Sequence, residues 1–115
     1  MTCIVFKSDK AFNHLVKHGY VYTLRRYARV GYKCLKRDRY GESVGLVKVE
    51  YIGTVVKLDT YFVNVNNRLI PLEHFVRHSG FNSLVEWLSE FRRLTGVFNP
   101  VNAKLLKVSL VRLFE

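Results

Sequence analysis

The residues most able to do chemistry in this 115-residue chain are gathered in one basic and aromatic stretch. Positions 20–40 read YVYTLRRYARVGYKCLKRDRY, where a strand-like alternation is combined with closely spaced arginine, lysine and tyrosine. Basic side chains attract phosphates, and exposed tyrosine rings can stack on unpaired bases. The stretch therefore predicts a groove for single-stranded nucleic acid. The basic candidates are Arg25, Arg26, Arg29, Lys33, Lys36, Arg37 and Arg39, and the aromatic candidates are Tyr27, Tyr32 and Tyr40.

Two further polar residues, Thr23 and Glu50, lie in strand-like segments and could contact a base directly. A threonine hydroxyl can donate or accept a hydrogen bond, and a carboxylate accepts one from an exocyclic amine. Structural roles stay open for both. Threonine is favoured in strands in any case, and Glu50 could form an ion pair with Arg25 or Arg26 across neighbouring strands.

The four histidines form two pairs at the i, i+4 spacing of a helix, which are His14 with His18 and His74 with His78. This spacing suits two ligands of one metal ion. Neither an H-E-x-x-H glutamate nor a cysteine cluster accompanies the pairs, however. We therefore expect solvent-facing helix residues, no metal and no cofactor.

The two cysteines, Cys3 and Cys34, are too few for a disulfide framework and too far apart for a C-x-x-C pair. Free cysteine commonly packs as a small buried hydrophobe. We expect both to be reduced and structural.

The composition indicates one domain spanning residues 1–115. Hydrophobic residues make up 49% of the chain, which is ample for a packed core. Nineteen lysine and arginine residues against nine aspartate and glutamate residues give a formal net charge of +10. Such a field attracts polyanions, so nucleic acid is the first partner to consider and an anionic membrane the second.

Membrane insertion and secretion are not predicted. No segment approaches the roughly 18 apolar residues of a membrane-spanning helix. The apolar run within MTCIVFKSDK is too short for the core of a signal peptide. We expect a cytoplasmic protein without a membrane partner.

Hydrophobic periodicity and capping residues predict the elements that must position these side chains. Ser8 or Asp9 caps a first helix that ends at Gly19, and Ser83 with Glu86 forms a capping box for a later one. The later helix carries a stripe of Leu84, Trp87, Leu88 and Phe91, which predicts core packing for the tryptophan. Strands are predicted at 3–8, 20–26, 30–36, 46–56, 58–65 and 104–114, helices at 9–18, 71–80 and 83–96, and a turn at 39–45.

This order of elements is typical of the α+β class. A doubly wound α/β sheet needs regular alternation of strands and helices, and the predicted order does not alternate in that way. We expect a small mixed β-barrel with the helices packed outside it.

The order of the segments resembles the ASCH domain family. The segment HGYVYTLRRY corresponds to the family's strand rich in Lys, Thr and Arg, and VGYKCLK keeps a family glycine as Gly31, with Tyr32 where an Asp is usual. The segment VKVEYIG places Glu50 where the family carries a glutamate, and GFNSLVEWLSEFRRLTG resembles its Trp-bearing helix. The resemblance covers nearly the whole chain and implies a PUA-like β-barrel associated with RNA.

Some ASCH members are amidohydrolases that deacetylate acetylcytidine, which implies a possible enzymatic alternative. Their motif G-x-K-T-x-T-x-R and a later Glu would match Thr23 and Glu50 here. The family arginine would match Arg25 if one residue is deleted after Gly19, and Arg26 otherwise. The lysine position holds Tyr20 or Val21, neither of which can activate a hydroxyl. Lys17 and Lys48 are the residues that could take the place of the missing family lysine.

The prediction is an RNA-binding module in which Thr23, Arg25, Arg26 and Glu50 line a cleft between barrel and helices. The basic stretch extends this cleft electrostatically. Single-stranded RNA is favoured, and DNA is the second nucleic acid considered. The alternative is an amidohydrolase or nuclease acting on a modified nucleoside or RNA in the same cleft. A third possibility is a protein-interaction module that uses the helix of Trp87.

Overall fold

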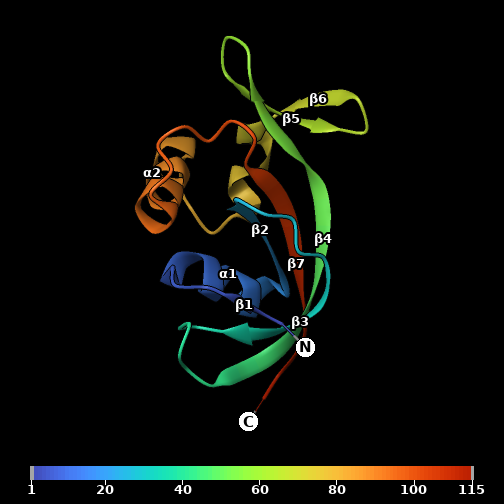
Figure 1. The fold of residues 1–115 in the computed structure, drawn as a ribbon, viewed down its shortest axis with the longest axis vertical. Coiled ribbons are helices and arrows are strands. Elements are labelled where there is room, and N and C mark those ends of the chain that lie inside the picture. The colour runs from blue at the N-terminus through green and yellow to red at the C-terminus, as the bar shows by residue number, and fades with distance from the viewer. Residues whose placement is uncertain (1, 115) are drawn as a thin grey trace.

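The protein has a mixed α+β fold in which three helices pack on one curled sheet (Figure 1). The computed structural model describes residues 2–114. None of the helices in this part of the chain is long and apolar enough to cross a membrane. In chain order the elements are β1 (Cys3–Val5), α1 (Asp9–His18), β2 (Tyr20–Arg25), β3 (Gly31–Lys36), β4 (Ser43–Lys57), β5 (Tyr61–Val65), β6 (Arg68–Pro71), the 3-10 helix η1 (Leu72–His78), α2 (Leu84–Thr95) and β7 (Lys104–Leu113).

The sheet is organised around β4, a strand of 15 residues. Its pairing with β3 on one side and β7 on the other produces a curled five-strand path in the order β1-β3-β4-β7-β2. The far end of β4 pairs with the β5–β6 hairpin, which lies at the opposite end of the molecule from the C-terminus (Figure 1). Within residues 2–114 the two edge strands of the curled path, β1 and β2, do not pair with each other. The sheet is therefore a half-barrel with a seam between β1 and β2.

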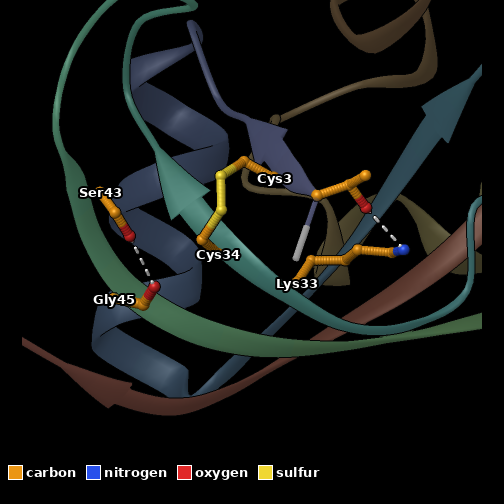
Figure 2. Close-up of a disulfide and its surroundings, with 6 residues drawn as sticks. Cys3, Lys33, Cys34, Ser43 and Gly45 are labelled. Carbon is orange, nitrogen blue, oxygen red and sulfur yellow. Dashed lines mark hydrogen bonds between the residues drawn. A yellow bond between two sulfur atoms is a disulfide. The ribbon is translucent and has the colours of Figure 1, made fainter.

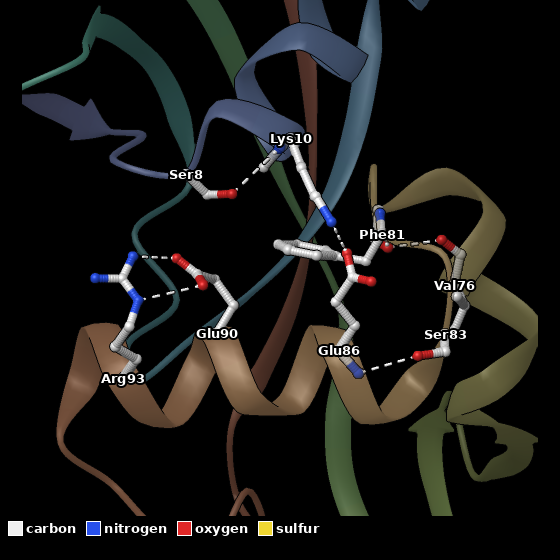
Figure 3. Close-up of polar contacts among 10 residues, drawn as sticks. Ser8, Lys10, Val76, Phe81, Ser83, Glu86, Glu90 and Arg93 are labelled. Carbon is white, nitrogen blue, oxygen red and sulfur yellow. Dashed lines mark hydrogen bonds and ion pairs between the residues drawn. The ribbon is translucent and has the colours of Figure 1, made fainter.

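Helices α1 and α2 begin and end at the predicted caps. The Ser8 hydroxyl accepts a hydrogen bond from the Ala11 amide, and the Ser83 hydroxyl accepts one from Glu86 (Figure 3). Both helices end at a glycine in the left-handed conformation. The predicted stripe on α2 is confirmed as a core face, with Leu84 half-buried and Trp87, Leu88 and Phe91 buried.

The segment 58–80 differs from its prediction. One strand and one α-helix were expected, but the chain forms a β5–β6 hairpin followed by a 3-10 helix. Asn66 and Asn67 both have positive φ, 51° and 67°, as a two-residue type I′ hairpin turn requires. The predicted turn at 39–45 is also shorter than expected, because β4 already begins at Ser43. The predicted α+β class is confirmed, whereas the predicted barrel is present only as a curled half-barrel.

The prediction of two reduced cysteines is wrong. Cys3 and Cys34 form a disulfide that joins β1 to β3, with their Cα atoms 4.3 Å apart (Figure 2). The two strands are parallel, and Cys3 lies directly opposite Cys34 in their register. A separation of 31 residues in sequence therefore becomes direct contact in the sheet.

A cluster of histidine and tyrosine side chains packs where α1 and η1 meet β2. The expected solvent exposure holds for His18 and His74 but is wrong for His14 and His78, which are half-buried. The Tyr20 hydroxyl is 2.5 Å from Nδ1 of His78. Nε2 of His14 is buried and has no hydrogen-bond partner among the described residues. Burial, and then nearby cationic groups, lower the pKa of both His14 and His78 below the usual value.

This cluster predicts that stability falls in mild acid. The folded pKa values of His14 and His78 lie below the unfolded value of about 6.5, so the unfolded chain binds protons first as the pH falls. The free energy of unfolding should be maximal above pH 6.5 and decline below it. Urea denaturation between pH 7.5 and 5 measures the decline, and it should flatten in the double variant His14→Gln with His78→Gln. If the free energy of unfolding of that variant declined with falling pH as steeply as that of the wild type, groups other than His14 and His78 would cause the decline.

Gly80 allows the turn between η1 and α2 to lie against α1. Its φ is +89°, and a Cβ atom at this position would overlap the carbonyl of Lys10, with the carbonyl carbon only 2.8 Å away. The turn is further held by Ser79, whose hydroxyl donates to the Val76 carbonyl at 2.6 Å. Because α2 begins four residues after Gly80, this close approach determines where α2 sits.

We expect Gly80→Ala to lower the free energy of unfolding by about 3 kcal/mol or more, because left-handed strain and overpacking add together. Gly96→Ala is the matched control. Its φ is +72°, but nothing lies within 4 Å of its Cβ position, so strain alone should cost about 1 to 2 kcal/mol. Denaturant titration of both variants provides the comparison. Equal losses would show that the contact with α1 is not tight.

Candidate nucleic-acid interface

Two connected cavities lie at the seam between β1 and β2. The inner cavity, about 190 Å³, lies between the two edge strands and α2. The outer cavity, about 500 Å³, opens from it toward the β2–β3 loop. Both are lined by Val5, Arg25, Leu94 and Thr95, so the two spaces form one continuous cleft. A cleft bounded by the sheet and a helix is the kind of site that the sequence predicted.

Arg25, the last residue of β2, lies at the junction of the two cavities. Its Nε donates a hydrogen bond to Oγ1 of Thr23 at 3.2 Å, and its guanidinium carbon lies 4.7 Å from the centroid of the Phe6 ring. Burial lowers the pKa of Arg25 to about 10, so the group is still cationic at pH 7. The residue is half-buried, and it lines both cavities.

The Arg25 guanidinium has no carboxylate partner within residues 2–114. The ion pairs there join Lys10 to Glu86, Arg37 to Asp9 and Arg93 to Glu90. Glu90 also lines the inner cavity, but it is engaged by Arg93 on the next turn of α2 (Figure 3). A buried cation without an anionic partner is costly. The arrangement therefore suits an incoming anion.

The outer cavity is a positively charged groove. Among its described lining residues none is acidic, and five are basic. Tyr27 also lines it, and this ring is 61% exposed and flanked by the guanidinium groups of Arg26 and Arg29 at 5.5 and 5.9 Å. The loop between β2 and β3 therefore presents charge and an accessible aromatic face together. The basic residues of the groove are Arg25, Arg26, Arg29, Lys33 and Arg39.

Not every basic candidate lines the cleft. Lys36 lies at the end of β3 and is outside both cavities. Arg37 has a structural role. It donates a hydrogen bond to the Phe6 carbonyl at 3.1 Å and forms an ion pair with Asp9, and its guanidinium carbon lies 4.2 Å from the centroid of the Phe12 ring. The exposed rings of Tyr32 and Tyr40 are likewise outside both cavities.

Thr23 and Glu50 are not brought together. Thr23 is buried in the inner cavity, opposite Leu106 of β7. Glu50 is exposed on β4, opposite Lys107, which in turn lies opposite Tyr22. Since directly paired residues share a face, Glu50 belongs to the face of Tyr22 and not to that of Thr23. Glu50 lies outside the cleft, and among the described residues it forms no ion pair with Arg25 or Arg26.

Sequence reasoning missed several residues of the inner cavity, namely Phe6, Lys7, Glu90 and Phe91. Trp87 was predicted as core, and it is indeed only 3% exposed, yet it also forms part of the cavity wall. The stripe on α2 indicated a buried face. It held no information about which part of the sheet that face would cover.

Comparisons of the chain with protein-family models, with curated proteins and with solved structures found no match.

We expect Arg25→Met to raise the free energy of unfolding by about 1 to 2 kcal/mol. Burial lowers the pKa of Arg25 to about 10, which corresponds to a cost of about 3 kcal/mol for keeping the charged group in the protein, and the lost hydrogen bond to Thr23 offsets only about 1 kcal/mol of it. Arg68→Met is the control, because it removes an exposed charge from β6 and should change stability by less than about 0.5 kcal/mol. Urea denaturation measures both. A clear loss of stability in Arg25→Met would show that the guanidinium is satisfied in the free protein.

Proposed function

We propose that the protein binds single-stranded RNA in the cleft at the β1–β2 seam. The observation that carries this proposal is Arg25, a half-buried and poorly solvated cation without a carboxylate partner among the described residues, which lines both cavities. A phosphate at this position would supply the missing anion. Charge-assisted hydrogen bonds from arginine to phosphate are among the strongest in proteins.

The phosphates of the strand would follow the outer cavity. Five basic residues line it, and the chain as a whole carries a formal net charge of +10. Tyr27 would stack on one base, since its ring is exposed beside two arginines. Stacking on an aromatic side chain contributes about 1 to 3 kcal/mol per base and tolerates any sequence.

The inner cavity would receive one unpaired base. Its lining includes the aromatic side chains of Phe6, Trp87 and Phe91, and Thr23 and Glu90 supply polar atoms for the edge of a base. A duplex keeps its bases stacked inside, so only a single strand or a loop can present a base in this way. The inner cavity is thus the reason to favour single-stranded over double-stranded partners.

The choice of RNA over DNA rests on the resemblance to ASCH domains. We propose that the half-barrel is a PUA-like barrel, which is supported by the order of its segments and by helices that pack beside the seam. The helix that resembles the family's Trp-bearing helix, α2, borders the inner cavity.

An amidohydrolase remains the second candidate, because Lys7, Thr23 and Glu90 line the same inner cavity. A nucleophilic hydroxyl needs a base within hydrogen-bond reach. Oγ1 of Thr23 instead accepts a hydrogen bond from Arg25, and Glu90 is paired with Arg93. Neither Lys17 nor Lys48 lines the cavity. Binding is therefore the function that the geometry supports best.

We expect the affinity for single-stranded RNA to fall steeply with salt. If the five basic residues neutralise five phosphates, the slope of log affinity against log salt should be about −3.5, at about 0.7 per phosphate. Fluorescence anisotropy with labelled oligonucleotides measures it. Single-stranded RNA should bind more tightly than duplex RNA of equal length, and single-stranded DNA tests the choice of RNA. Affinity that does not change with salt would exclude the proposal.

A charge-matched pair of variants tests where the strand lies. Arg29→Ala with Arg39→Ala removes two cations of the groove, so the slope should fall to about −2. Lys57→Ala with Arg68→Ala removes two exposed cations near the β5–β6 end and should leave the slope unchanged. Equal effects of the two double variants would show that binding depends on net charge alone.

A further inference from the structure

The Cys3–Cys34 disulfide borders the proposed RNA cleft. Cys3 itself lines the outer cavity, and its partner is the residue directly after Lys33, one of the basic residues of that cavity (Figure 2). Both cysteines are half-buried, and Cys3 lines the outer cavity, so the bond lies at the wall of the cleft and is not enclosed in the core. A change in the redox state of this pair would therefore change the wall of the cavity in which the RNA would bind.

The short strand β1 is a wall of both cavities. Thr2, Cys3, Ile4 and Val5 line the outer cavity, and Val5 and Phe6 line the inner one. This wall pairs on one side only, with three residues of β3. Backbone hydrogen bonds from Cys34 N to Thr2 O, 3.1 Å, and from Phe6 N to Lys36 O, 2.8 Å, mark the two ends of the contact. The disulfide is the covalent link across it.

Two cations of the cleft depend on the position of β1. The ammonium of Lys33 donates to Oγ1 of Thr2 at 2.8 Å (Figure 2). Arg25 lies against the ring of Phe6, which directly follows β1 and is 2% exposed. A shift of β1 would therefore open the wall of the groove and displace both Lys33 and Arg25.

We propose that the Cys3–Cys34 disulfide is a redox gate on the cleft, so that the oxidised protein binds RNA and the reduced protein releases it. The inference rests on the proposed function and adds its regulation. Reduction leaves β1 as an edge strand of three residues held by a few hydrogen bonds, which is a weakly held element. In the reduced protein, β1 would occupy several positions, and only one of them would form the wall that binds RNA.

The chemistry requires a dithiol reductant. One thiolate of the reductant attacks a sulfur of the disulfide and releases the other cysteine, and the second thiol of the reductant then attacks the mixed disulfide and releases the remaining cysteine. Two electrons and two protons pass to the protein, whose S–S bond becomes two thiols, while the reductant becomes a disulfide.

Affinity for a labelled single-stranded RNA should be measured on the oxidised protein and on protein reduced with dithiothreitol, at a temperature where circular dichroism shows both to be folded. Thiol titration establishes the two states. We expect the reduced form to bind about tenfold more weakly, as when the competent population falls to about a tenth. The variant Cys3→Ser with Cys34→Ser should bind like the reduced form and should not respond to dithiothreitol.

The thermodynamic linkage between RNA binding and disulfide reduction supplies a second measurement. If oxidation strengthens RNA binding tenfold, saturating RNA must make the disulfide harder to reduce by the same factor, which lowers its reduction potential by about 30 mV. A glutathione or dithiothreitol redox titration with and without RNA measures this shift. No shift in potential, together with equal affinity of the two redox states, would overturn the gate.

Hydrogen exchange separates the gate from the proposed function. Amides of residues 3–6 and 34–36 should exchange faster in the reduced protein, while those of β4 and β7 stay protected. This test needs no RNA. If the oxidised protein does not bind RNA, the proposed function fails; if β1 exchanges equally in both states, the gate fails. Global unfolding on reduction would also overturn it, because a gate requires a folded reduced form.

Discussion

The structure depends on a sheet that curls but does not close. In the path β1-β3-β4-β7-β2, the two edge strands face each other across a seam without pairing within residues 2–114. Unpaired edges are a liability that proteins usually cover. Here α2 lies over the seam, and its buried Trp87 and Phe91 form the inner wall of the cavity. The cleft is thus a direct result of incomplete closure, because a paired β1–β2 ladder would leave no space for it.

The charges of the seam follow from the same geometry. Arg25 ends β2 at the point where the edge strand leaves the sheet, so its guanidinium lies between buried apolar residues and the basic loop that follows. Other cations near the core are satisfied locally, as Arg37 is by Asp9 and by the Phe6 carbonyl. Arg25 has only a hydroxyl and an aromatic ring as partners among the described residues. Sites that keep such an unbalanced charge commonly do so for a ligand.

What the sequence could predict was local. Caps at Ser8 and Ser83, glycines that end both α-helices and the stripe of Trp87 each depend on neighbours within one turn, and all were confirmed. The basic stretch also supplied Arg25, Arg26 and Tyr27 to one cleft. Its use in binding RNA stays a prediction, as do the ASCH resemblance and the cytoplasmic location.

What the sequence could not predict was register and contact between distant segments. The disulfide requires the parallel register of β1 and β3, which no local pattern encodes. The face of Glu50 depends on its pairing with β7, where one step along the strand reverses the face of a side chain. Lys7 and Glu90 became cavity residues through the packing of α2, which is held against α1 by Gly80 and by the ion pair of Lys10 with Glu86 (Figure 3).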